Sequence, residues 1–103
     1  MGQITILYWR DIPAQVIARQ GRQSAKRVLS ARFAEAIDRA AMRAGLTGTD
    51  AYLQAWRRSP ASPCGDDLEA AAAAVAARLE DAFTDQLLRT MVVNGGEAPV
   101  SPV

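Results

Sequence analysis

An alternating pattern near the start of the chain restricts the possible folds more than any other feature. From Ile4 to Trp9 successive side chains point to opposite faces of an extended chain, and both faces are largely apolar. After the breaker Asp11-Ile12-Pro13, a second run rich in β-branched residues spans 14–20 and ends at Gly21. Pro13 suits the loop exit, where no ladder donor is needed. The sequence therefore predicts a β-hairpin whose first strand is central in a sheet or covered on both sides.

The middle of the chain adds one clear helix and one ambiguous segment. Residues 22–29 are polar and basic without a period, which predicts a loop. Apolar residues at helical spacing then run from Ser30, a suitable N-cap, to Gly45, a suitable left-handed end. Residues 50–58 fit a helix capped by Asp50 or a strand. We expect the strand, because a two-stranded hairpin is marginal without a third strand.

The last part of the chain predicts two further helices. Residues 59–65 read as a linker, and Asp66 with Glu69 resembles a capping box for a helix that reaches about Asp81. A short helix over 84–93 follows. The expected fold is α+β in the order β-β-α-β-α, with a three-stranded antiparallel sheet packed against two main helices and a short C-terminal helix. Residues 1–93 form one domain, and 94–103 are expected to be a disordered tail.

Composition excludes several kinds of site. The chain has no histidine and one cysteine, Cys64, so imidazole catalysis, His-ligated metal and an internal disulfide framework are ruled out. Asp66, Asp67 and Glu69 could hold a hard cation, but helix capping explains them. We expect no catalytic residues, no cofactor and no bound metal. No apolar run approaches the length of a membrane helix, which predicts a cytoplasmic protein with no membrane contact.

Charge is distributed unevenly along the chain. Residues 1–60 hold ten basic and four acidic side chains, whereas 61–103 hold two basic and seven acidic ones, within a net charge of +1. Arg19, Arg22, Lys26 and Arg27 form a basic stretch suited to phosphates or another anionic ligand, with binding that depends on salt. The alternative is a charged strand end that discourages edge pairing. No RNA-binding signature accompanies these residues.

A second candidate surface lies at the predicted hairpin turn. Arg10 and Asp11 could orient a partner, or Asp11 could cap the turn beside a solvated Arg10. Trp9 and Trp56, with the two arginines that follow Trp56, could form an aromatic contact platform, and Tyr8 is a further candidate. The alternative is that both tryptophans belong to the core. These five residues are the interaction candidates.

The chain resembles a small bacterial family described as virulence factor. The resemblance rests on the string YWRDIPAQV over 8–16, on EAIDRAAMRAGL over 35–46 and on DAYLQAW over 50–56, and it extends over about residues 4–92. The family is essentially uncharacterised. Its longer relatives combine a similar domain with a NifU-like segment and helical repeats. The stand-alone members look like proteins encoded near one-carbon and corrinoid methyl-transfer enzymes.

These observations favour a non-catalytic function. We expect an accessory or protein-interaction domain in a bacterial cytoplasm, with a protein partner. The resemblance implies a possible link of that partner to one-carbon or corrinoid methyl-transfer enzymes. One alternative is nucleic-acid or anionic-ligand binding through the basic stretch, and another is a non-catalytic subunit of a larger enzyme.

Overall fold

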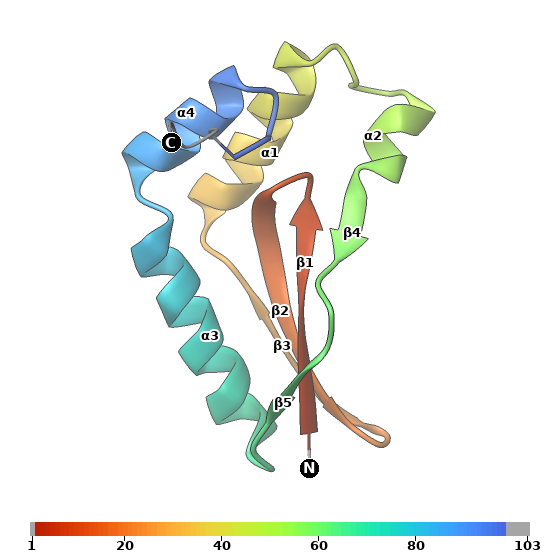
Figure 1. Cartoon of the computed structure of the whole chain (residues 1–103), viewed down its shortest axis with the longest axis vertical. Helices are drawn as coiled ribbons and strands as arrows, with labels where there is room; N and C mark the ends of the chain where they lie inside the picture. Colours follow the sequence, from red (N-terminus) through yellow and green to blue (C-terminus); the bar gives the residue numbers. More distant parts are fainter. Residues whose placement is uncertain (1, 99–103) are drawn as a thin grey trace, which may run out of the picture.

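The protein folds into an antiparallel sheet with helices, as Figure 1 shows for the computed structural model, which describes residues 2–98. The α+β class is as predicted. The helix α3 runs along the sheet, while α1 and α4 lie together near the end where the first two strands meet. The elements in chain order are β1 (Gly2–Trp9), β2 (Ile12–Gln20), β3 (Gln23–Val28), α1 (Ala31–Arg43), α2 (Asp50–Gln54), β4 (Trp56–Arg58), β5 (Ser62–Cys64), α3 (Leu68–Ala82) and α4 (Asp85–Val93).

The strand β1 is central, as its two apolar faces predict. The sheet order is β3-β2-β1-β4, and β5 also pairs with β1, beyond the end of β4. The predicted hairpin is β1–β2, with Trp9 opposite Ile12. The register shifts between Leu7, opposite Gln15, and Tyr8, opposite Pro13. Pro13 therefore lies inside β2 next to this bulge rather than in the loop, because a bulge tolerates a missing ladder donor.

Two predictions about connecting segments are wrong, and a third, the strand over 50–58, is correct only for its last part. Residues 23–28, expected as a loop, form the edge strand β3, where only Ala25 is buried. Residues 50–58 contain both alternatives, a short helix and then a short strand. The expected linker contains β5. These strands lack the apolar alternation that sequence patterns detect, since backbone pairing with a central strand holds them rather than buried side chains.

The start and end of the helices differ in detail from the prediction. Asp67, not Asp66, caps α3, and its side chain accepts the N–H of Ala70. Ser30 precedes α1 without capping it through its side chain. Residues 94–98, expected to begin a disordered tail, are instead hydrogen-bonded to the body of the protein. The remaining part of that expected tail, 99–103, lies outside the described residues.

Two apolar clusters form the core. The first gathers Trp9 and Ile12 from the hairpin end with α1 and α4 side chains such as Phe33 and Met91. The second lies between the sheet and α3, and its buried members are Ile4, Val16, Ala18, Ala25, Leu68 and Ala72. The clusters adjoin through Ala76 and Leu79 of α3, which pack against both. Within the described residues, no helix is both long and apolar enough to span a bilayer.

Candidate interaction surface

The turn between β1 and β2 is hydrogen-bonded to segments that are distant in the sequence. The backbone of Arg10 has a φ of +52°, a left-handed conformation that costs free energy in a residue other than glycine. Its N–H donates to the carbonyl of Ala55 at 3.0 Å, and its guanidinium donates to the carbonyl of Gly95 at 2.9 Å. Arg57 donates to the Arg10 carbonyl at 2.8 Å. Segments distant in sequence therefore hold this turn in place.

Asp11 completes the same set of contacts. Its carboxylate accepts hydrogen bonds from the Arg57 guanidinium at 3.0 Å and from the Ala98 N–H at 2.7 Å. Its own N–H donates to the Gly96 carbonyl. The side chains of Arg10 and Asp11 are thus engaged within the protein. A partner that bound this pair would compete with these internal bonds.

The aromatic candidates also have internal roles. Trp9 is fully buried, and its Nε1–H donates to the Tyr52 carbonyl at 3.0 Å. The Tyr52 ring packs on Trp9 and, edge-on, on Trp56, with ring centroids 5.7 Å and 6.4 Å apart. The guanidinium of Arg57 stacks over the Tyr8 ring at 4.6 Å. Because it is buried, Trp9 cannot be a contact residue, and the core alternative describes it correctly.

The basic stretch is placed quite differently. Arg19 is the second-last residue of β2, Arg22 lies in the turn, and Lys26 and Arg27 lie on β3. All four belong to one hairpin, which we call the basic hairpin. All four side chains are exposed. Among the described residues none of them has a hydrogen bond or an ion pair, whereas Arg10, Arg32 and Arg57 do. Their charges are therefore free to meet an external group.

Two of these cations share one face of the sheet. One rung across β1, β2 and β3 consists of Gln3, Arg19 and Ser24. A second rung consists of Thr5, Ile17 and Lys26. Because adjacent residues on neighbouring strands share a face, these two rungs form one surface. It lies opposite the side chains that pack under α3, and five of its six residues are exposed or half-buried, whereas Ile17 is buried at 7% exposure. We call this surface, which holds no carboxylate, the open face.

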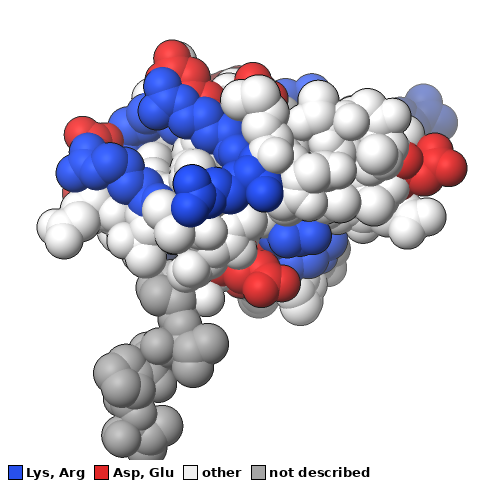
Figure 2. Space-filling view, turned by 90° about the horizontal axis from the view of Figure 1, so that it is seen from above, with Lys and Arg blue, Asp and Glu red and all other residues white. Residues whose placement is uncertain are grey.

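A groove between α1 and α4 is a second surface feature, at the other end of the molecule. It has a volume of about 400 Å³ and a floor of Ala36, Leu88 and Val92. Figure 2, seen from that end, shows basic side chains around a small hollow with acidic ones at its margin. The charged lining residues are Arg32, Glu35, Arg39, Asp85 and Arg89. Both signs of charge meet there, so the groove has no clear preference for an anion.

Comparison with known proteins now adds a family. The family model described as virulence factor matches residues 7–92. This chain belongs to that family. No curated protein and no solved structure matches this chain. The matched range contains both the bound turn and the basic hairpin, and in this chain the string YWRDIPAQV forms the turn between β1 and β2 with the bulge beside it.

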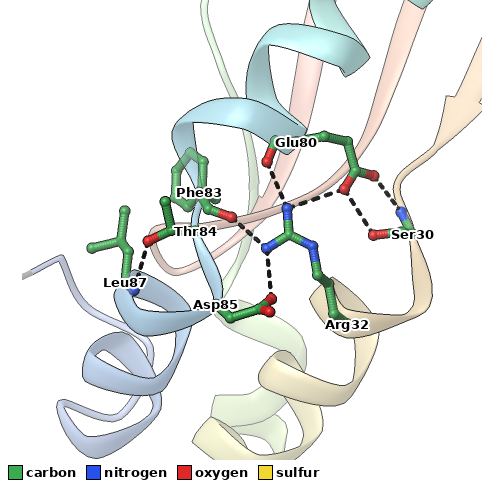
Figure 3. Close-up of polar contacts among 7 residues, drawn as sticks. All are labelled: Ser30, Arg32, Glu80, Phe83, Thr84, Asp85 and Leu87. Carbon is green, nitrogen blue, oxygen red and sulfur yellow. Dashed lines mark hydrogen bonds and ion pairs between the residues drawn. The ribbon is translucent and has the colours of Figure 1, made fainter.

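Sequence reasoning missed one polar centre in this family member, which Figure 3 shows. Arg32 of α1 donates to the carbonyls of Glu80 and Phe83, where α3 ends. The guanidinium also pairs with the carboxylates of Glu80 at 3.1 Å and Asp85 at 3.2 Å. Glu80 in turn accepts the N–H and the hydroxyl of Ser30 at 2.7 and 2.8 Å. Sequence patterns could not link these residues, because about 50 positions separate Ser30 and Arg32 from the residues at the end of α3 and the start of α4.

The same centre predicts a dependence of stability on pH. Desolvation acts to raise the pKa of Glu80, but hydrogen bonds from Ser30 and Arg32 and the charge of Arg32 lower it below its usual value of 4.5. A carboxyl whose pKa is lower in the folded state stabilises the fold above its unfolded pKa, and loses this effect as pH falls through the folded pKa. Urea unfolding of wild type and Glu80→Gln should therefore differ at pH 7, and the difference should shrink as pH falls below about 4.5.

A matched variant controls for the general effect of acid on the protein. Asp81 is exposed, and Asp81→Gln removes one carboxylate next to Glu80 without touching the Arg32 centre. We expect little change in its free energy of unfolding at either pH. An equal loss for Glu80→Gln at pH 7 and pH 3 would contradict the assigned role of the Glu80 charge.

No group of three or more Cys, Asp or Glu among residues 2–98 is arranged to hold a metal ion. Cys64 is half-buried in β5, paired opposite Gly2. Its Sγ lies 2.9 Å from the position where a Cβ on Gly2 would stand, so close packing explains a small residue at position 2.

Proposed function

We propose that this chain is a non-catalytic accessory domain that binds an acidic partner protein through the basic hairpin, in the bacterial cytoplasm. The observation that carries this proposal is that Arg19, Arg22, Lys26 and Arg27 are exposed and free of internal partners, beside a sheet face without carboxylates. Free cations in one patch attract an anionic surface and speed its approach. The proposed contact site is therefore not the turn at Arg10 and Asp11, where β2 begins, but the basic hairpin at the other end of β2.

A protein partner fits this surface better than a nucleic acid. Single-stranded nucleic acid is gripped by cations together with aromatic rings on which bases stack. The open face holds no aromatic residue, since Tyr8, Trp9, Tyr52 and Trp56 contact one another or Arg57 near the other end. Asp66, Asp67 and Glu69 also line a hollow beside Gln23 and Ala25, where they would repel a phosphate backbone.

The role of the turn residues supports a non-catalytic function. Their side chains are engaged in internal bonds, so we assign them to fixing the hairpin rather than to presenting a reactive group. The link to one-carbon and corrinoid methyl-transfer enzymes remains a prediction from the family resemblance. It names the first candidate partners to test.

The experiment is capture from the native cell with the tagged full-length chain. One variant replaces Arg19, Arg22, Lys26 and Arg27 by glutamine. A matched variant replaces by glutamine four other exposed arginines that have no hydrogen bond or ion pair among the described residues, namely Arg39, Arg43, Arg78 and Arg89. Both variants lose four positive charges, so only the position of the loss differs. Capture is run from lysates with and without nuclease treatment, and the bound proteins are identified by mass spectrometry.

We expect a defined protein with wild type and with the matched variant, and its loss with the basic hairpin variant. The complex should weaken as salt rises, since exposed charges are screened over about 10 Å at 0.1 M salt. Equal capture by both variants would place the contact elsewhere. Capture that nuclease abolishes would favour the nucleic-acid alternative.

A further inference from the structure

The two edges of the sheet are protected unequally. On one side β4 and β5 are three residues each, with Pro60 between them and Pro63 within β5. Short strands and prolines are the usual means of blocking strand addition. On the other side β3 runs for six residues without glycine, proline or a bulge, and among the described residues it pairs with β2 alone. One long, straight edge is therefore available.

The register shows which backbone groups of β3 are free. A two-residue turn joins β2 to β3, and the Gln20–Gln23 pair closes it. Farther along, Leu29 donates its N–H to Ala14, toward β2. The hydrogen-bonding direction alternates along a strand, so the backbone groups of the odd-numbered β3 residues face β2. The N–H and C=O groups of Ser24, Lys26 and Val28 therefore point outward. Val28 is also the most exposed large apolar side chain, at 74%.

Charge decides what can pair with this edge. A second copy of the chain would bring Lys26 and Arg27 against the same cations, which is unfavourable. A strand with acidic side chains on the open face would instead lie beside Lys26 and near Arg19. On the other face Arg27 projects from β3, and Asp66, Asp67 and Glu69 line a hollow of about 390 Å³ beside this strand. Both signs of charge are present there, so uncharged side chains fit. The preferred strand therefore alternates acidic and uncharged residues.

We propose that the partner adds an extended acidic segment to β3 as a sixth strand, with carboxylates on the open face and uncharged residues toward α3. This inference rests on the proposed function and specifies its binding mode. Backbone hydrogen bonds supply the affinity in such strand addition, and alternate side chains supply the specificity. Lys26 then has two separable roles, as a cation and as a backbone donor.

The test uses a synthetic peptide of four Glu-Thr repeats, titrated into the full-length protein and followed by amide chemical shifts. Two control peptides are four Lys-Thr repeats and the Glu-Thr peptide with every backbone amide methylated. Lys26→Gln removes the charge but keeps the N–H, and Lys26→Pro removes both. Proline is tolerated where an edge N–H faces solvent, so the second variant should still fold.

We expect shifts along β3 and slowed exchange of the Ser24, Lys26 and Val28 amides with the Glu-Thr peptide only. Lys26→Gln should weaken binding about two- to fivefold, as for an exposed ion pair. Lys26→Pro should weaken it about tenfold more, as for a lost hydrogen bond and a blocked edge. If Lys26→Pro does not fold, the methylated peptide still tests the backbone bonds.

The outcomes separate this inference from the function it rests on. Equal binding of the methylated peptide would overturn strand addition and leave charge attraction. No binding of any peptide, while the cellular partner still depends on the basic hairpin, would also overturn strand addition alone. Binding of the Lys-Thr peptide, or self-association of the protein that survives salt, would contradict the acidic class of partner. Failure of both the peptide binding and the cellular capture would end both proposals.

Discussion

Replacing Trp9 by alanine should remove a large part of the stability of the protein. Its ring is fully buried among α1 and α4 side chains and makes contact with Tyr52. Removal of a buried tryptophan costs about 3–5 kcal/mol, against a total of about 5–15 kcal/mol for a typical domain. The Tyr52 carbonyl also loses its donor. Urea unfolding followed by circular dichroism should show a much lower midpoint.

The control for this variant is Val28→Ala. Val28 is large and apolar but 74% exposed, so its truncation should change the free energy of unfolding by no more than about 0.5 kcal/mol. If Trp9→Ala matched Val28→Ala, Trp9 could not lie in the core. It would then become available again as the contact residue of an aromatic platform.

The parts of the fold that could be predicted are those with a strong side-chain period. The alternation over 4–9 predicted a central strand, and the spacing of Phe33, Ile37 and Ala40 predicted α1, because burial of a face imposes each period. The strands β3, β4 and β5 have no such period. They are held by backbone pairing to β1 and β2, which depends on the neighbouring strand rather than on the segment itself.

The candidate site shows the same division. The four cations of the basic hairpin could be found from sequence, since they lie close together along the chain. That they are free of partners could not, because Arg10, Arg32 and Arg57 have the same chemistry and are bound. Their partners, Gly95, Glu80 and Asp11, lie 46 or more positions away along the sequence. Only the folded structure separates bound from available charge.

The C-terminal segment is the clearest failure of sequence reasoning. Two glycines and a lack of period indicated disorder from Asn94 onward. Those glycines are present for a steric reason, because Gly95 and Gly96 have φ values of +71° and +97°, which favour glycine. The segment turns back so that Gly96 packs on Trp9 and Ala98 donates to Asp11. The two glycines therefore indicate a specific turn rather than a flexible segment.

Gly96→Ala should therefore destabilise the protein strongly. A Cβ at this position would lie 2.6 Å from Cζ3 and 3.0 Å from Cε3 of Trp9, a ring that is fixed in the core. Gly96 also donates its N–H to Met91 and accepts the N–H of Asp11, so it cannot shift without breaking these bonds. Strain at a positive φ costs about 1–2 kcal/mol, and overpacking adds about 1–3 kcal/mol.

Gly48→Ala is the matched control, because it separates the two costs. Gly48 also has a positive φ, +74°, but a Cβ there would meet nothing within 4 Å. Urea unfolding should show a loss of about 1–2 kcal/mol for Gly48→Ala and a clearly larger loss for Gly96→Ala. Equal losses would mean that the segment after α4 detaches at little cost. Asp11 would then lose its contact to Ala98, and the turn at Arg10 and Asp11 would become accessible to a partner.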